Sequence, residues 1–317
     1  MRVQQLINTH RILKLPKNPL ILINATQSGG FQAWSKERGL GPYNDIEIHL
    51  ENFKRFCLID KQLTHGVSKT HVRMIRHFYK FLNKKINQIT IEDVRRYLEF
   101  YRTTKAIKSY ANLLCSLKRY FRDYLHKDYL VESFEFPNIE YIPPIAPSDN
   151  DLRTFYNALP TMRYKALFLL LAASGRRLHE VLELTKSDIN WEMRMILPKN
   201  TNKIKRTWYS FFNEETETIL REYLQTRKDN DTRLFTTGTN HVGQEFKKVA
   251  DMIGIRITPQ TLRVWFACKM GDLNVPDRYI DAFCGRTPKS VLARHYTDYS
   301  PERLKRIYDK ANLKILS

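Results

Sequence analysis

Cysteine is scarce in this sequence. The chain has four in 317 residues, and they stand far apart, as Cys57, Cys115, Cys268 and Cys284. No CxxC pair and no cluster of cysteine with histidine occurs, which argues against a structural zinc site and a disulfide scaffold. A carboxylate cluster suited to two-metal chemistry is also absent. We therefore expect no metal and no other cofactor, and a reducing compartment.

Long apolar runs and a targeting segment are missing as well. The longest apolar run, ALFLLLAAS from Ala166, is half of the roughly 18 residues that span a membrane, and it predicts a buried helix. The N-terminus lacks the charged region, apolar core and cleavage site of a secretory signal. We expect a soluble, cytoplasmic protein with no membrane partner.

Positive charge is what the sequence has in excess. It contains 53 Lys and Arg against 33 Asp and Glu, a formal net charge of +20 at pH 7. Such a charge favours a polyanionic partner, because neutralising phosphates releases condensed counterions. With 42% hydrophobic and 12% aromatic residues the chain can bury proper cores, so it is no disordered polycation. A basic but uninvolved surface is the alternative.

Periodicity divides the chain into two mainly helical domains. Residues 45–136 carry amphipathic helical patterns, and TIED at Thr90–Asp93 is a capping-box signature. Four prolines in EFPNIEYIPPIAP restrict the chain to extended conformations, so we expect a linker at 137–148. Residues 149–317 form the second domain, with a β-hairpin near 195–211 and a terminal helix at 301–315. The fold class is mainly α with a small sheet, and the arm 1–44 has no assigned role.

Basic residues recur on the helices of the first domain. A solvated surface and a DNA-facing surface explain them about equally well. The candidate DNA-binding residues are Lys105, Lys108, Lys118, Arg119 and Arg122.

Three segments of the second domain place arginine where a buried segment would not normally carry it. ASGRRLHEVLEL sets Arg176 and Arg177 beside the apolar helix, TPQTLRVWFA sets Arg263 among apolar residues, and FCGRTPKSVLARHY sets Arg286 after a glycine. Arginine in apolar surroundings is costly unless it is paired. Internal salt bridges would satisfy it, and so would a phosphodiester, because a guanidinium grips two phosphate oxygens at once.

In this order the segments resemble the tyrosine recombinases, or phage integrases, over roughly residues 45–317. The tail RHYTDYSPERLKRIYDKANLKIL looks particularly like integrases of archaeal viruses and plasmids. The resemblance implies a helical core-binding domain followed by a catalytic domain. It makes Arg177 and Arg263 the catalytic arginines, Glu180 the carboxylate that orients Arg177, and Tyr296 the nucleophile.

Other positions depart from the family's pattern. Gln260 stands where histidine usually opens the second box, and Arg286 replaces the histidine of a Gly-His pair. Both still donate hydrogen bonds, so the site implied leans on electrostatics more than on imidazole chemistry. A lysine of the hairpin turn would protonate the leaving oxygen: Lys199 fits best, with Lys203 in reserve.

Three residues near these positions are weaker candidates for a role in the site. His295 could contact the same phosphate, and a structural role is equally open to it. Tyr299, one helical turn after Tyr296, is expected to pack. Arg176 is expected to face solvent or the DNA backbone.

The resemblance implies a site-specific DNA recombinase that acts through a 3′-phosphotyrosyl intermediate without metal or ATP. Its partner would be double-stranded DNA at attachment sites, bound by a homotetramer on two duplexes and by a monomer or dimer when free. The apolar stripe of the terminal helix could dock on a neighbouring copy or fold back. Alternatives are a Xer-like chromosome-dimer resolvase, a type IB topoisomerase-like enzyme, and a non-catalytic DNA-binding protein whose site has decayed, which Gln260 and Arg286 favour.

Overall fold

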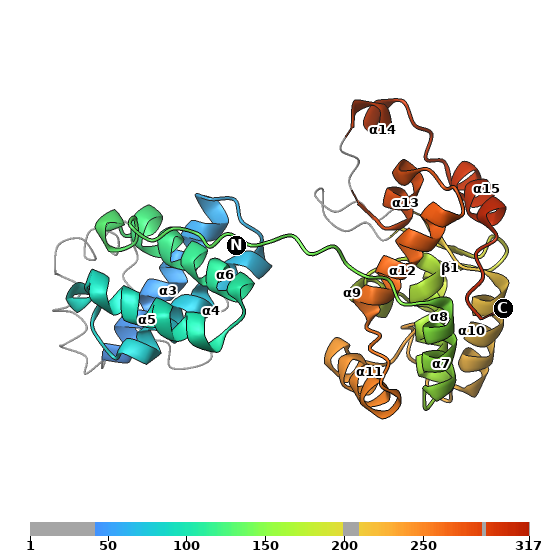
Figure 1. The fold of residues 1–317 in the computed structure, drawn as a ribbon, viewed down its shortest axis with the longest axis horizontal. Helices are drawn as coiled ribbons and strands as arrows, with labels where there is room; N and C mark the ends of the chain where they lie inside the picture. Colours follow the sequence, from blue (N-terminus) through green and yellow to red (C-terminus); the bar gives the residue numbers. More distant parts are fainter. Residues whose placement is uncertain (1–41, 199–208, 287–289, 317) are drawn as a thin grey trace, which may run out of the picture. The chain divides into compact units, whose positions relative to one another are not determined.

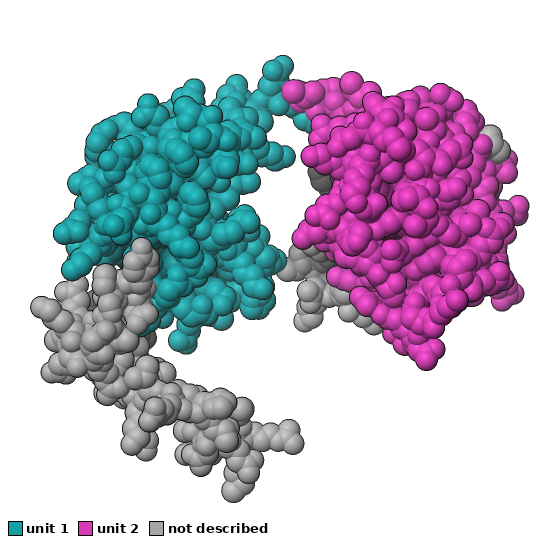
Figure 2. All heavy atoms as spheres, turned by 90° about the horizontal axis from the view of Figure 1, so that it is seen from below, with its two compact units in different colours: residues 1–141 teal, residues 142–317 magenta. Residues whose placement is uncertain are grey.

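The computed structural model describes residues 42–198, 209–286 and 290–316, and the side chains of the first helix from residue 46. The chain forms two compact units, residues 1–141 and 142–317, which are coloured separately in Figure 2. The division falls within the proline-rich segment 137–148. The lysines at 199 and 203 lie outside the described residues, as does the arm up to residue 41.

Unit 1 is entirely helical among its described residues (Figure 1). Its α-helices are α3 (Pro42–Ile59), α4 (His65–Leu82), α5 (Ile91–Thr104) and α6 (Ile107–Lys118), with the π-helical turn η2 (Arg119–Tyr124) and the 3₁₀ turns η1 (Ile86–Gln88) and η3 (Asp128–Leu130). The predicted capping box is confirmed, because Thr90 Oγ1 accepts from the Asp93 backbone N–H at 3.3 Å and Asp93 Oδ2 accepts from that of Thr90 at 3.0 Å.

The core of unit 1 is rich in aromatic rings. Phe78, buried on α4, meets Tyr97 of α5 and Phe121 of η2 edge-to-face, at centroid distances of 5.1 Å and 5.7 Å. The hydroxyls of Tyr79 and Tyr120 lie 3.1 Å apart. Since aromatic side chains bury large areas, these contacts join three helices into one core.

Unit 2 is mainly helical with one small sheet, and the predicted fold class is confirmed. Its α-helices are α7 (Asp149–Ala158), α8 (Met162–Ser174), α9 (Leu178–Leu182), α10 (Glu214–Thr226), α11 (Thr239–Ile253), α12 (Pro259–Asp272), α13 (Asp277–Phe283), α14 (Val291–His295) and α15 (Pro301–Ala311). The antiparallel sheet β1 (Ile189–Asn190), β2 (Met195–Ile196) and β3 (Ser210–Phe211) contains the expected hairpin and one further strand. Ile189 pairs with Ile196 and Met195 with Phe211.

Helix α8 forms the centre of unit 2. Every residue from Ala166 to Ser174 is buried, as the apolar sequence predicts, and α10 and α12 pack against the helix. It ends at Gly175, whose φ of +62° lies in the left-handed region. Among the described residues no helix is both long and apolar enough to cross a membrane.

The terminal helix α15 folds back on its own unit. Tyr308 donates from its hydroxyl to the carbonyl of Ala173 at 2.9 Å, and its ring meets those of Phe211 and Phe283. Leu304 and Ala311 of the apolar stripe are buried and Ile307 is half-buried. The helix ends at Ala311 rather than at 315, because Asn312 adopts a left-handed conformation with φ +48°.

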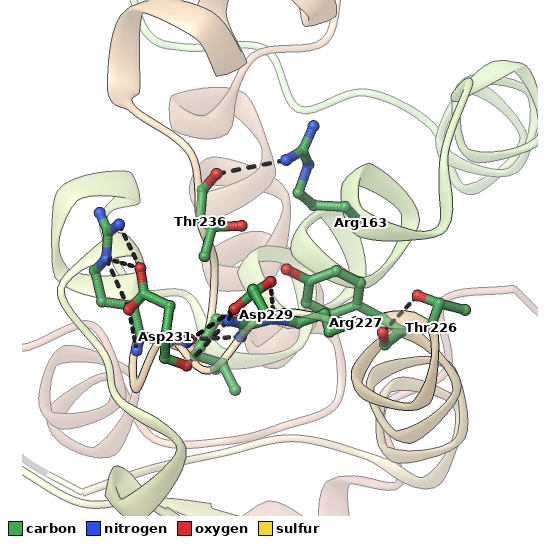
Figure 3. A network of polar contacts seen from close by, with 9 residues as sticks. Arg163, Thr226, Arg227, Asp229, Asp231 and Thr236 are labelled. Carbon is green, nitrogen blue, oxygen red and sulfur yellow. Dashed lines mark hydrogen bonds and ion pairs between the residues drawn. The ribbon is translucent and has the colours of Figure 1, made fainter.

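A buried arginine closes the loop after α10 (Figure 3). Arg227 donates from Nη1 to the carbonyls of Arg233 and Leu234 at 2.6 Å and 3.1 Å, and it pairs with Asp229. Arg163 near the start of α8 donates to the carbonyl of Thr236 at 3.4 Å. These bonds satisfy backbone carbonyls that no helix or strand would otherwise satisfy.

Candidate active site

The first arginine of the candidate site lies at the start of α9. Arg177 donates from Nη1 to Glu180 Oε1 at 2.8 Å, and its backbone N–H donates to Glu180 Oε2 at 3.0 Å. Burial raises the pKa of Glu180, but these bonds outweigh that effect and hold the pKa below its ordinary value. The carboxylate is thus ionised and fixes Arg177, whose side chain stays 38% exposed.

The second arginine approaches the first from α12. Arg263 is only 4% exposed, and its Nη1 donates to the carbonyl of Gly175 at 2.7 Å. Gly175 ends α8 and precedes the Arg176–Arg177 pair, so this bond fixes α12 to the loop of the first arginine. Burial lowers the pKa of Arg263, and the nearby charges of Arg177 and Arg286 lower it further. An anion placed here would relieve this repulsion.

Arg286 lies at the edge of this arginine cluster, and Gln260 precedes Arg263 by three residues on α12. Arg286 follows Gly285, which has φ +61°, and donates from Nη1 to Asp281 Oδ1 at 2.9 Å. About half of its side chain is exposed, 49%, and its charge still influences Arg263. Gln260 is exposed in the first turn of α12, on the helical face of Arg263.

Sequence reasoning missed the thiol of Cys284, which lies beside the same arginines. The residue is fully buried, and burial raises its pKa although the charges of Arg263 and Arg286 act in the opposite direction. The thiol is therefore held neutral. Its position between the apolar end of α13 and Gly285-Arg286 was the only signal available in the sequence.

The expectation that Arg176 faces solvent or the DNA backbone is wrong. Its side chain turns into the unit, and the residue is only 3% exposed. Nε donates to Ser210 Oγ at 2.5 Å and Nη2 to the carbonyl of Ile196 at 3.4 Å, so Arg176 joins the loop of Arg177 to β2 and β3. Burial lowers its pKa to about 10. Hydrogen bonds to β2 and β3 compensate the desolvation of the buried guanidinium. These bonds could not be foreseen from the sequence.

Tyr296 lies apart from the arginine cluster. It follows α14, donates its backbone N–H to the carbonyl of Leu292 at 3.0 Å, and is 76% exposed. Figure 1 shows α14 standing away from α9 and α12. Tyr296 instead lines a cavity with Arg278 and Arg303. The described residues thus bring together Arg177, Glu180, Arg263 and Arg286, and Tyr296 is not among them.

The neighbours of Tyr296 differ in their surroundings. The hydroxyl of Tyr299 donates to the carbonyl of Ala293 at 2.8 Å, which agrees with the packing role expected for it. His295 is exposed in the last turn of α14.

The basic residues of unit 1 fall into two groups. Lys105 and Lys108 are exposed near the junction of α5 and α6. Arg119 and Arg122 pair with Asp123 at 2.6 Å and 2.8 Å. Lys118 donates to the carbonyl of Glu132 at 3.4 Å. Of the five candidate DNA-binding residues, only Lys105 and Lys108 present charges with no protein partner among the described residues.

Comparison with known proteins identifies the family of this chain. Residues 148–303 match the model of the phage integrase family, and residues 50–130 match that of the phage integrase N-terminal SAM-like domain. The chain is 26% identical over 277 residues to tyrosine recombinase XerA of Pyrococcus horikoshii, covering 83% of this chain and 93% of the relative. With XerA of Saccharolobus solfataricus the identity is 25% over 214 residues, covering 64% and 72%.

Solved structures share the fold. The Tn1549 transposon integrase in complex with transposon right end DNA matches with a TM-score of 0.57 at 14% identity, over 81% of this chain and 97% of that one. The XerH site-specific recombinase bound to difH substrate matches with a TM-score of 0.55 at 15% identity, over 81% and 82%. This chain belongs to the phage integrase family of tyrosine recombinases, enzymes of site-specific DNA recombination.

Proposed function

We propose that the enzyme cleaves and rejoins DNA through Tyr296, with the scissile phosphate held by Arg177, Arg263 and Arg286. A phenol titrates near 10, so at neutral pH it is a poor nucleophile until its charged form is stabilised. Guanidinium groups around the phosphate favour the phenolate and stabilise the charge of the pentacoordinate transition state.

Bond making and bond breaking balance in this scheme. The hydroxyl oxygen of Tyr296 loses its proton to solvent and bonds to phosphorus, while the bond from phosphorus to the 5′ oxygen breaks. That oxygen takes a proton, which we assign to Lys199 with Lys203 in reserve. The 3′-phosphotyrosyl bond conserves the energy of the phosphodiester, so a 5′ hydroxyl can reverse the step without ATP. Gln260 donates to the phosphate, and His295 is a possible further donor.

The single observation that carries the proposal is the hydrogen bond from Arg263 to Gly175. It supports a preorganised anion site, because arginines far apart in sequence are held near one another at a cost in desolvation and repulsion. The pairing of Arg177 with Glu180 supports the same interpretation. In a DNA-binding protein without catalytic activity, this energetically costly arrangement would serve no chemistry.

The proposal includes a rearrangement on DNA. Tyr296 has to reach an arginine cluster, either that of its own copy or that of a second copy. Mixing Arg177→Gln with Tyr296→Phe distinguishes the two cases. Adduct formed by the mixture assigns attack to a second copy's cluster, and no adduct assigns it to the same copy.

Covalent trapping tests the proposal. The full chain is incubated with nicked suicide duplexes carrying a randomised central segment, so that a cleaved strand cannot be rejoined, and adducts are sequenced and mapped by mass spectrometry. We expect wild type and Tyr299→Phe to form a tyrosyl adduct and Tyr296→Phe to form none. An adduct that persists in Tyr296→Phe would overturn the assignment of the nucleophile.

For the biological role we propose an integrase of an archaeal mobile element. The tail after Arg294 supports this through its resemblance to such integrases. The XerA relatives favour a second candidate, a Xer-like resolvase. Recombination between two different trapped sites supports the integrase, whereas exchange only between identical sites supports the resolvase. Relaxation of supercoils without any site preference would instead indicate a topoisomerase-like activity.

The domain roles and the assembly are part of the same proposal. Residues 45–136 act as the core-binding domain, 137–148 as the linker and 149–317 as the catalytic domain. Four copies assemble on two duplexes inside the cell, and free protein is a monomer or dimer. The mass of the complex on trapped-site DNA, measured by light scattering, tests the tetramer.

A further inference from the structure

A second basic site lies beside Tyr296, separate from the arginine cluster. A cavity of about 320 Å³ opens where the start of α13, the end of α14 and the start of α15 meet. Its lining residues are Arg278, Tyr279, Leu292, Tyr296, Thr297, Asp298 and Arg303. The reacting groups assigned above include only one of these residues, Tyr296.

The two arginines of the cavity converge on one buried tyrosine. Arg303 donates from Nε to the hydroxyl of Tyr279 at 3.0 Å, and the Arg278 guanidinium lies 5.0 Å from the centroid of the same ring. Tyr279 is only 3% exposed, so it is a fixed platform. Because Arg303 uses Nε for this bond, both of its terminal nitrogens remain available as donors.

Neither arginine forms an ion pair in the described part of the chain. Six other arginines of unit 2 have a carboxylate within ion-pair distance, and Arg278 and Arg303 have none there. Asp298 lines the cavity, but its oxygens accept from the N–H and hydroxyl of Ser300 at 2.8 Å and 3.2 Å. Asp298 stays ionised and its charge acts on Arg303, so the two arginines exceed the carboxylate by one positive charge.

The charges of this cavity and of the arginine cluster act on different groups. The largest charge effects on Arg263 come from Cys284, Arg177 and Arg286. Burial tends to raise the pKa of Tyr279, but Arg303 and Arg278 outweigh this and lower it. Arg278 and Arg303 are thus not among the main charges that act on Arg263, and they form a second group of positive charge in the same unit.

We propose that Arg278 and Arg303, oriented by Tyr279, bind a DNA backbone phosphate other than the scissile one. Two guanidinium groups on a rigid ring suit the two non-bridging oxygens of a phosphodiester. Because Tyr296 lines the same cavity, this phosphate would lie next to the nucleophile before Tyr296 moves to an arginine cluster. The inference rests on the proposed function only in naming DNA as the source of the phosphate.

Binding without cleavage tests this site. The full chain carrying Tyr296→Phe is titrated against a fluorescent pool of 30-base-pair random duplexes at several KCl concentrations. Each phosphate contact contributes about 0.9 to the slope of log K against log[salt]. We expect Arg278→Gln with Arg303→Gln to reduce the slope by about 1. The matched control, Arg306→Gln with Lys310→Gln, removes two exposed charges from α15 outside the cavity and should change it less.

Tyr279→Phe separates a built site from a general loss of charge. It keeps the net charge and the ring but removes the acceptor of Arg303, so we expect weaker binding with an unchanged melting temperature. An unaltered slope in the Arg278/Arg303 variant would overturn the proposal. The proposal would also be overturned if the α15 control reduced the salt slope as much and Tyr279→Phe bound DNA normally.

A second readout locates the phosphate. On a trapped-site duplex, single neutral methylphosphonates are placed at successive positions of the backbone. Wild-type binding should weaken at one position near the cleaved bond, and the Arg278/Arg303 variant should be insensitive there alone. Identical profiles for the two proteins would contradict the site. The salt experiment needs neither a cognate site nor cleavage, so it holds even if the nucleophile assignment fails.

Discussion

Arg263 and Gly175, 88 positions apart in the chain, are joined by a hydrogen bond of 2.7 Å from Nη1 to the carbonyl oxygen. The glycine supplies more than this acceptor. Its left-handed φ of +62° ends α8, and the next two residues diverge, Arg176 into the unit and Arg177 towards Glu180. The turn at Gly175 therefore fixes three arginines at once.

Substitution of Gly175 by alanine should be costly for two reasons. The left-handed conformation costs an L-residue about 1–2 kcal/mol, and a Cβ would lie 2.3 Å from the Phe266 ring. Gly254→Ala is a matched control, because its φ is +73° and nothing lies within 4 Å of the added Cβ. We expect a loss in the free energy of unfolding of about 3 kcal/mol or more at Gly175 and about 1 kcal/mol at Gly254.

Urea unfolding of the full chain measures both variants. Cleavage should fall more than stability alone explains in Gly175→Ala, since the alanine also displaces the acceptor of Arg263. Equal losses of stability in the two variants would show that the Phe266 ring moves to make room for the methyl group, so that the contact adds no steric cost.

Arg263→Gln should impair the chemistry far more than it impairs DNA binding. Glutamine keeps a hydrogen-bond donor, but it is shorter than arginine and carries no charge for the transition state. Loss of one such preorganised donor typically costs about 10²–10³ in rate. Single-turnover adduct formation measures this, with exposed Arg256→Gln as the control for net charge. A rate loss matched by an equal loss of affinity would mean that Arg263 only binds DNA.

Local features of the fold were predictable because neighbouring residues determine them. The apolar run of α8, its glycine cap, the Thr90–Asp93 capping box and the hairpin each depend on a few adjacent side chains. Strand β1 was missed, since it holds one apolar residue followed by an asparagine, whereas the hairpin strands lie within longer β-prone runs.

The sequence indicated candidate site residues but not their arrangement. Sequence resemblance picked out Arg177, Glu180 and Arg263. It gave no reason to place Arg176 against Ser210. The motif does not distinguish Arg176 from Arg177, and Ser210 of β3 lies 34 positions further along the chain. The placement of Tyr296 beside Arg278 and Arg303 depends on how three helix ends meet, which a linear pattern does not encode.

Arg176 and Ser210 should be energetically coupled. Ser210→Ala leaves a buried guanidinium N–H without its acceptor and should cost about 1–3 kcal/mol. In an Arg176→Met background the same substitution should cost at least 1 kcal/mol less, because the donor is gone. A double-mutant cycle by urea unfolding measures the coupling. Additive losses would show that the 2.5 Å contact contributes nothing to stability.

The basic residues of unit 1 should separate into binding and structural groups. Lys105→Gln with Lys108→Gln removes two exposed charges and should reduce the salt slope of DNA binding by about 1–2 if both contact phosphates. Arg119→Gln instead removes one of the two arginine partners of Asp123, which is 13% exposed, and should lower the melting temperature of unit 1. Anisotropy titrations and thermal unfolding distinguish these outcomes. If Arg119→Gln reduced the salt slope by the same amount, Arg119 would instead be a residue that contacts DNA.

The capping box at Asp93 should make unit 1 sensitive to acid. Burial raises the pKa of Asp93, but hydrogen bonds from Lys84 and Thr90 outweigh it and hold the pKa below 3.8, its ordinary value. A depressed pKa contributes stability above the unfolded value, and that stability disappears as pH falls through the lower folded value. Asp93→Asn should therefore destabilise unit 1 at pH 7, and the difference from wild type should shrink below about pH 4. Exposed Glu92→Gln is the control, and a deficit in Asp93→Asn that persists undiminished at pH 2 would show that shape, not charge, stabilises this helix start.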